Sequence, residues 1–216
     1  MTTKTTSMIA LVLIALALLA GAVLWNQLPD QMASHWNVND EVDGTIPKFW
    51  GVSLMPLITL GMLVLFLVLP GMDPLKANIA QFRGSFNLFI VLMVAFMLYI
   101  HGLTLAWSLG HKDFKMSAAM LPFMGLLFIA IGAMLRKAKR NFFIGIRTPW
   151  TLSSDGVWDK THQLGSTLFM ASGVLAVIGG FFGGTTAFWL MFAPLIGSSL
   201  FLVIYSYVLY RGETKA

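Results

Sequence analysis

The run MIALVLIALALLAGAVLW, from Met8 to Trp25, decides the fold because it has no charged residue over a length that can cross a bilayer. A transmembrane helix needs about 20 consecutive, mainly apolar residues. Further runs of this kind follow along the chain, and none contains Asp, Glu, Lys or Arg. They are Gly51–Leu69, Ser85–Trp107, Met116–Leu135, Leu164–Gly183 and Ala187–Tyr210.

These runs predict an all-α polytopic membrane protein with six transmembrane helices. In hydrocarbon the backbone must satisfy its own hydrogen bonds, so such segments cross as helices. A barrel would require alternating apolar and polar residues, which the runs lack. The composition, 57% hydrophobic and 11% charged, is far from that of a soluble domain. The first run outlasts a signal-peptide core of about 7–15 residues, so we expect it to be a span.

The basic residues predict an orientation with both termini in the cytoplasm. In that orientation the outer segments hold only Lys48, Lys112 and Lys115, against eleven basic residues inside. Cytoplasmic loops carry such an excess of Lys and Arg. The inner residues are Lys4, Lys76, Arg83, Arg136, Lys137, Lys139, Arg140, Arg147, Lys160, Arg211 and Lys215.

Two polar segments divide the chain into two expected modules. Residues 1–84 form an N-terminal module with two spans and an acidic external loop at 26–50. Residues 85–216 form a module with four spans and a cytoplasmic loop at 136–163. The external loop is acidic because it holds Asp30, Asp40, Glu41 and Asp43.

Several chemistries are excluded or disfavoured by composition. The chain has no cysteine, so it has no disulfide framework, thiol nucleophile or thiolate metal site. His35, Asp43, His101 and His111 all fall toward the outer end, but their spacing matches no zinc motif. We expect no metal and no cofactor. The net charge of +5 favours contact with anionic lipid headgroups rather than with nucleic acid.

The outer loop is a candidate ligand-binding segment. His35 and Trp36 place a titratable ring beside a large aromatic anchor, and Asn37 follows them. Asp43 and Gly44 predict a tight turn, since glycine adopts positive φ freely. The acidic groups favour a cationic ligand. The alternative is a small lid whose Trp36 inserts into the membrane interface.

The inner loop has a composition richer than a connector needs. Thr148 precedes Pro149, which forces an extended or turn conformation at Thr148. Ser153 or Ser154 can cap a following helix. That helix is expected to be short and amphipathic and to lie on the inner surface before the fifth span. A hydrolase triad of Ser154, Asp155 and His162 lacks any nucleophile elbow and is rejected.

The inner loop closely resembles the signature of SdpI-family membrane proteins. The outer loop, from Leu28-Pro29 through His35-Trp36-Asn37 to Asp43-Gly44, resembles a small module of unknown function often found ahead of that signature. The matching inner positions are Asn141, Gly145, Arg147, Thr148, Pro149, Trp150, Trp158 and His162. The resemblance implies a multi-pass protein of the bacterial cytoplasmic membrane, with these residues as its signature positions.

The resemblance also implies a function, which is immunity against a secreted toxic peptide that attacks the membrane. The protein would be non-enzymatic and would contact membrane lipid, a toxic peptide on the outer face and a cytoplasmic regulatory protein. Two other classes stay open on the residues alone. One is a small transporter using His101 and Asn87, since ionisable groups within spans mark transport pathways. The other is a metal-dependent membrane enzyme using the outer histidines.

Overall fold

The computed structural model describes residues 1–214 and contains six helices long and apolar enough to cross a membrane. This confirms the predicted helical, polytopic membrane fold. The long helices are α1 (Thr3–Leu24), α2 (Lys48–Met72), α3 (Lys76–Ser108), α4 (Met116–Leu135), α6 (Asp155–Gly179) and α7 (Gly184–Glu213). The shorter elements are the 3-10 turn η1 (Trp25–Gln27), strands β1 (Gln31–Trp36) and β2 (Val42–Pro47), and helix α5 (Pro149–Ser153).

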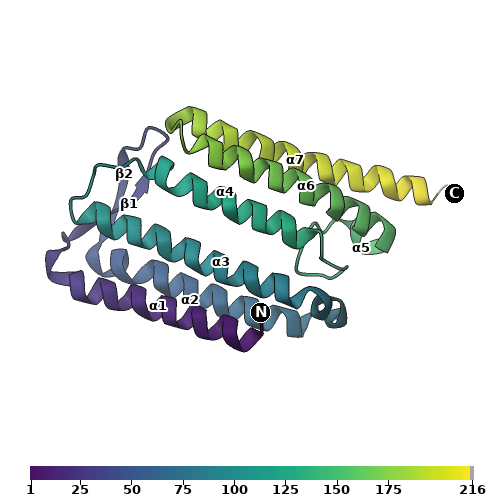
Figure 1. The fold of residues 1–216 in the computed structure, drawn as a ribbon, viewed down its shortest axis with the longest axis horizontal. Helices are drawn as coiled ribbons and strands as arrows, with labels where there is room; N and C mark the ends of the chain where they lie inside the picture. The colour runs from purple at the N-terminus through teal and green to yellow at the C-terminus, as the bar shows by residue number, and fades with distance from the viewer. Residues whose placement is uncertain (215–216) are drawn as a thin grey trace.

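The long helices lie in two groups of three. Helices α1, α2 and α3 pack together, α4, α6 and α7 pack together, and α3 contacts α4 between the groups. The strands lie at one end of the bundle and the loop from α4 to α5 lies at the other (Figure 1). We call these the hairpin end and the loop end. Helix α1 begins and helix α7 ends toward the loop end, as an even number of crossings requires.

The helix α3 is longer than the predicted span and crosses the expected module boundary at residues 84 and 85. It runs from Lys76 to Ser108 with a kink at Phe82, where φ is −119° and ψ is 16°. The division of the chain into modules at that boundary stays a prediction.

Small residues hold α4 and α6 in close contact. A Cβ added to Gly125 would lie 2.5 Å from the carbonyl oxygen of Gly173, and one added to Gly132 would lie 2.7 Å from that of Ser166. In membranes, interfaces of small residues let helix backbones approach closely. Small residues near the other end of α6 continue this contact, since Ala176 is buried and Gly180 faces Pro122.

A polar contact ties the start of α1 to α3. The Asn87 amide donates to the carbonyl of Met1 at 3.1 Å and to the Thr3 hydroxyl at 3.3 Å, and Asn87 accepts from Arg83 Nε at 3.1 Å. Buried apolar residues of all three helices then continue the core of this group. Among them are Ala10, Ile14, Leu63, Ile90 and Val94.

The predicted turn at Asp43-Gly44 is wrong, because both residues lie within strand β2. Strands β1 and β2 form an antiparallel hairpin in which His35 pairs with Gly44 and Trp36 pairs with Val42. The chain instead reverses between Asn37 and Glu41, where Asp40 has a φ of 64°. The hairpin itself was not predicted, since the pairing is irregular beside His35 and the run lacks clean alternation.

The predicted surface helix before the fifth span is also wrong. Ser154 caps a helix as expected, and its hydroxyl accepts from the Val157 N–H at 3.2 Å. That helix is α6, which continues without a break through the span to Gly179. The apolar face of its first turns packs inside the protein and does not lie on the membrane surface, because Val157, Trp158 and Thr161 are buried.

Replacing Gly125 with alanine is expected to weaken the α4–α6 contact. The added methyl group meets the Gly173 backbone, and overpacking of this kind costs about 1–3 kcal/mol. The measurement is thermal unfolding of the purified protein in detergent. Gly61→Ala is the matched control, since a Cβ at Gly61 in α2 meets nothing within 4 Å. Equal melting temperatures for the two variants would contradict the packing role.

Candidate functional site

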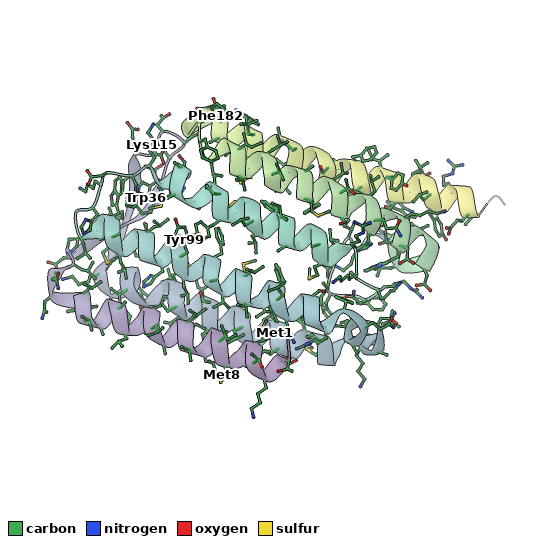
Figure 2. All side chains as sticks on the ribbon, viewed as in Figure 1. Met1, Met8, Trp36, Tyr99, Lys115 and Phe182 are labelled. Carbon is green, nitrogen blue, oxygen red and sulfur yellow. The ribbon has the colours of Figure 1, made fainter. Side chains whose placement is uncertain are left out.

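A cavity of about 350 Å³ at the hairpin end brings together part of the predicted ligand-binding segment. The turn of the hairpin forms one wall, and the first turns of α4 and α7 form the others. Figure 2 labels Trp36 and Lys115 at this end. The polar or hairpin-derived lining residues are His35, Trp36, Asn37, Val38, Asp40 and Ser117, and the apolar ones include Met116, Met120, Leu121, Phe188, Met191 and Phe192.

His35 and Asp43 form an exposed pair on the hairpin. His35 Nδ1 lies 2.5 Å from Asp43 Oδ1, and both side chains are largely open to solvent. His35 lines the cavity, whereas Asp43 and Gly44 do not. Gly44 contributes by its small size, because a Cβ there would lie 3.0 Å from the Cβ of His35. The structure therefore divides the predicted outer residues into cavity-lining and supporting positions.

Asn37 shapes the turn of the hairpin. Its side-chain oxygen accepts from the N–H groups of Asn39 at 2.9 Å and Glu41 at 3.1 Å. Its amide donates to the Glu41 carboxylate at 2.9 Å. Asparagine commonly bonds to backbone a few residues on and so stabilises turns. The turn that presents Val38 and Asp40 to the cavity thus depends on Asn37.

Asp40 binds the start of α4, a contact that the sequence did not reveal. Its carboxylate accepts from the Ser117 N–H and from the Ser117 hydroxyl, both at 2.7 Å. Ser117 lies in the first turn of α4, whose free N–H groups favour a carboxylate. A capping residue 77 positions away has no local sequence signal, so only the tertiary structure exposes it.

Trp36, the last residue of strand β1, packs against the end of α3. Its ring packs edge-on against Trp107 at 5.7 Å, and Trp107 packs in the same way against Phe114 at 5.7 Å. The buried indole nitrogen of Trp36 has no hydrogen-bond partner among residues 1–214. Trp36 is half-buried and packs on the end of α3, and the alternative of a lid whose Trp36 inserts into the membrane interface stays a prediction.

At the loop end, Asn141 organises the segment that follows α4. It is fully buried, and its amide donates to the carbonyls of Lys139 at 2.8 Å and Ile144 at 2.9 Å. Its oxygen accepts from the N–H groups of Phe143 at 3.0 Å and Ile144 at 2.6 Å. One side chain thus binds four backbone groups of the loop, and its two bonds with Ile144 are buried.

Trp158 and His162 lock the loop onto α6. The Trp158 indole donates to the Ala138 carbonyl at 2.9 Å, and its ring stacks on His162 at 3.9 Å. His162 Nε2 accepts from the Ile146 N–H at 3.0 Å, so Nδ1 carries the proton and donates to the Trp158 carbonyl at 2.9 Å. Gly145, with φ of 117°, lies so close that a Cβ would overlap His162.

Thr148 and Pro149 start helix α5 and attach it to α7. The Thr148 hydroxyl accepts from the Thr151 N–H at 3.1 Å, and the Thr151 hydroxyl accepts from the Thr148 N–H at 2.9 Å, which makes a capping box. Thr148 also contacts the Ser206 hydroxyl at 3.0 Å. Trp150 packs against Tyr207 with ring centroids 5.0 Å apart.

Arg147 is an exposed, charged member of the signature positions. Its guanidinium donates to the Phe142 carbonyl at 2.9 Å, which closes the loop across its own backbone. The rest of that side chain remains open to solvent. The signature loop is therefore held together by Asn141, Trp158 and His162, which contact only the protein itself. The Arg147 side chain, in contrast, is exposed and can contact a partner.

Asp73, in the turn between α2 and α3, is a second residue that sequence reasoning missed. It is 2% exposed, and its carboxylate accepts from the N–H groups of Leu75 at 2.7 Å and Phe142 at 2.8 Å. Asn78 adds a bond to the Arg140 carbonyl at 2.8 Å. These contacts fasten the signature loop to the first helix group. An acidic residue beside a proline resembles an ordinary turn in sequence.

The residues of the rejected hydrolase triad do not meet as a triad. Ser154 Oγ donates to the Glu213 carboxylate at 2.6 Å, Asp155 pairs with Arg140 at 2.7 Å, and both His162 nitrogens bond to backbone groups. Within residues 1–214, no three His, Cys, Asp or Glu side chains cluster as metal ligands would. The structure therefore does not assemble the outer histidines into a metal centre.

The transporter alternative also lacks the arrangement it requires. Asn87 and His101 are 14 residues apart on α3, which is roughly 21 Å along the helix axis. Asn87 bonds at the start of α1, whereas His101 lines a cavity of about 100 Å³ near the hairpin end. The two polar residues therefore do not line a common path.

The six apolar helices and the loops at both ends define a multi-pass bacterial membrane protein. The SdpI/YfhL protein family matches residues 137–206, and a domain of unknown function (DUF1648) matches residues 12–60. The chain is similar to "Immunity protein SdpI" of Bacillus subtilis (strain 168). The two are 25% identical over 206 residues, which cover 95% of this chain and 96% of that protein. No solved structure matches the chain significantly.

These comparisons confirm the predicted resemblance, because a region that matches the SdpI/YfhL protein family follows one that matches this domain of unknown function. The SdpI match contains every signature position of the inner loop, from Asn141 to His162. The other match contains the whole hairpin, including His35, Trp36 and Asp40. The hairpin and the inner signature positions therefore fall in separate family matches, whereas the hairpin-end cavity also takes lining residues from α7, within the SdpI/YfhL match.

Replacing Asn141 with aspartate is expected to destabilise the signature loop. The shape is kept, but the two donors to Lys139 and Ile144 are lost and a charge is buried. Leaving buried carbonyls unsatisfied costs about 1–3 kcal/mol, and more for a charged group. The measurement is the rate of limited proteolysis within residues 136–154. Gln163→Glu, an exposed amide-to-acid change on α6, is the control and should leave cleavage unchanged.

Replacing Asp40 with alanine is expected to loosen the hairpin from α4. Loss of a capping carboxylate costs about 0.5–2 kcal/mol, so the melting temperature in detergent should fall. Asp113→Ala removes an exposed acidic residue of the neighbouring connection and is the control. A melting temperature lowered equally by both changes would mean that Asp40 acts only through net charge.

Proposed function

We propose that this protein confers immunity against a secreted, membrane-active peptide. The observation that carries the proposal is the similarity to an immunity protein over 95% of the chain, which includes both loop regions. The absence of an assembled triad or metal cluster within residues 1–214 is compatible with a role that involves binding rather than catalysis.

The proposed orientation places the hairpin end outside and the loop end in the cytoplasm. It rests on the excess of Lys and Arg at the loop end, where ten of the thirteen basic residues within residues 1–214 fall. A positive-inside bias of this size usually sets the orientation of a polytopic protein. A peptide arriving from outside would then meet the hairpin and not the signature loop.

The chemistry of the hairpin-end cavity indicates the kind of peptide that fits it. Met120, Phe188 and Phe192 provide an apolar floor, and methionine side chains adapt readily to different partners. Asp40 and the exposed Glu41 add negative charge at the turn. We expect an apolar or aromatic side chain in the cavity, with a cationic group of the peptide beside these carboxylates.

The signature loop would face a cytoplasmic regulatory protein. Helix α4 links the two ends, since Asp40 caps its first turn and the Trp158 indole binds Ala138 just beyond its last turn. Arg147 and Trp150 offer exposed or half-exposed contacts at that end. A peptide that displaces Asp40 from Ser117 would thus act directly on the helix that leads into the loop.

The test is complementation in a Bacillus subtilis strain that lacks its own immunity protein SdpI. The full chain is expressed, its presence in the membrane is confirmed by immunoblot, and the cells are challenged with the peptide against which that protein protects. Survival should rise at least tenfold over the empty vector. No gain in survival, with the protein present in the membrane, would overturn the proposed immunity.

Cavity variants then test the proposed binding surface. His35→Ala and Met120→Trp should reduce survival, because the first removes a lining group and the second fills the cavity. His111→Ala is the matched control, since this exposed histidine of the same end does not line the cavity. Full protection by both cavity variants would place the peptide elsewhere while leaving immunity itself intact.

A further inference from the structure

A second cavity lies between the two helix groups near the loop end. Its volume is about 280 Å³, and it receives side chains from α2, α3, α4, α6 and the signature loop. The lining is aromatic and aliphatic throughout, and no charged side chain within residues 1–214 contributes to it. Representative members are Phe66, Phe89, Ile131, Phe143, Ile146 and Phe169.

Three basic residues lie next to lining residues of this cavity, either in space or along the chain. The Arg83 guanidinium lies 5.7 Å from the ring centre of Phe86, which is part of the lining. Arg136 and Lys137 follow the lining residue Leu135 directly, and both are exposed. Within residues 1–214, none of these three cations forms a salt bridge with a carboxylate, whereas Lys139 and Arg140 pair with Asp159 and Asp155.

We propose that this cavity binds one acyl chain of an anionic phospholipid, whose headgroup rests on Arg83, Arg136 and Lys137. An apolar chamber among membrane helices suits hydrocarbon, and unpaired basic residues at its edge suit a phosphate. A neutral lipid would satisfy the chamber but leave the cations without partners. A free anion would do the reverse, so only a molecule with both parts matches the site.

The bound chain would touch the signature loop itself. Ile144, Gly145 and Ile146 line the cavity, and the Ile146 N–H is the group that donates to His162. A chain that fills the space beside Ile146 would support the backbone that this hydrogen bond fixes. The inference does not depend on immunity, because it concerns only the cavity, its charges and the surrounding membrane.

The experiment is native mass spectrometry of the full-length protein in detergent, with three lipids compared. The first two are phosphatidylglycerol and phosphatidylcholine with the same sixteen- and eighteen-carbon chains, and the third is phosphatidylglycerol with six-carbon chains. We expect the long-chain anionic lipid to bind at least tenfold more tightly than the other two. Equal binding of both long-chain lipids would indicate nonspecific annular lipid and overturn the proposal. Equal binding of both anionic lipids would indicate a headgroup site without the acyl chain and would also overturn it.

Variants separate the two halves of the site. Ile131→Trp fills the cavity and should abolish the preference for long chains, and Leu69→Trp repeats this test from α2 should the first variant fail to fold. The double change of Arg136→Gln and Lys137→Gln should lower binding of the anionic lipid roughly tenfold or more, since each basic residue near an anionic headgroup adds attraction. Arg211→Gln, at the last turn of α7, is the charge control. Unchanged binding in the filled or the doubly neutralised variant would refute the site.

Discussion

Helices α4 and α6 approach each other through glycines, and this close contact sets the position of both ends of the molecule. The Gly125 and Gly173 backbones face each other with no room for a Cβ on either side. In hydrocarbon the hydrophobic effect does not drive helices together, so close van der Waals packing between small residues carries more of the association. Because α4 is held along its length, its first turn meets Asp40 and the residues after its last turn meet Trp158.

The loop end follows from a second constraint, which is the need to satisfy backbone groups away from water. The chain leaves α4 and must return to α6 through a segment that is partly buried. Asn141 binds four backbone groups, and His162 binds two more through its two ring nitrogens. Polar groups buried without partners would cost about 1–3 kcal/mol each, so these side chains hold one loop conformation. The composition that marked this segment in the sequence is therefore largely structural.

The hairpin end is built with fewer internal bonds and more open surface. Its cavity combines an apolar floor from α4 and α7 with polar groups from the hairpin, and it joins parts of the chain matched by different families. This contrast suits the proposed function, in which the hairpin end binds the peptide and the loop end stabilises the helix bundle. In the proposed lipid site, an acyl chain in the apolar cavity beside the signature loop would further stabilise the loop end.

The sequence by itself determined the six helices, their even number of crossings and the positions of the two polar loops. Long runs without charge have one stable form in hydrocarbon, so length and composition suffice. It also offered Ser153 or Ser154 as the helix cap, of which the structure uses Ser154, and the family resemblance marked Gly145 and His162. Only the tertiary structure decided that α6 runs unbroken from its cap and that the outer loop is a hairpin. It also decided that Asp40 fastens this hairpin to α4 and that Asp73 fastens the signature loop to the turn between α2 and α3. Those outcomes depend on partners far along the chain, such as Ser117 for Asp40 and Phe142 for Asp73, and no local pattern encodes them.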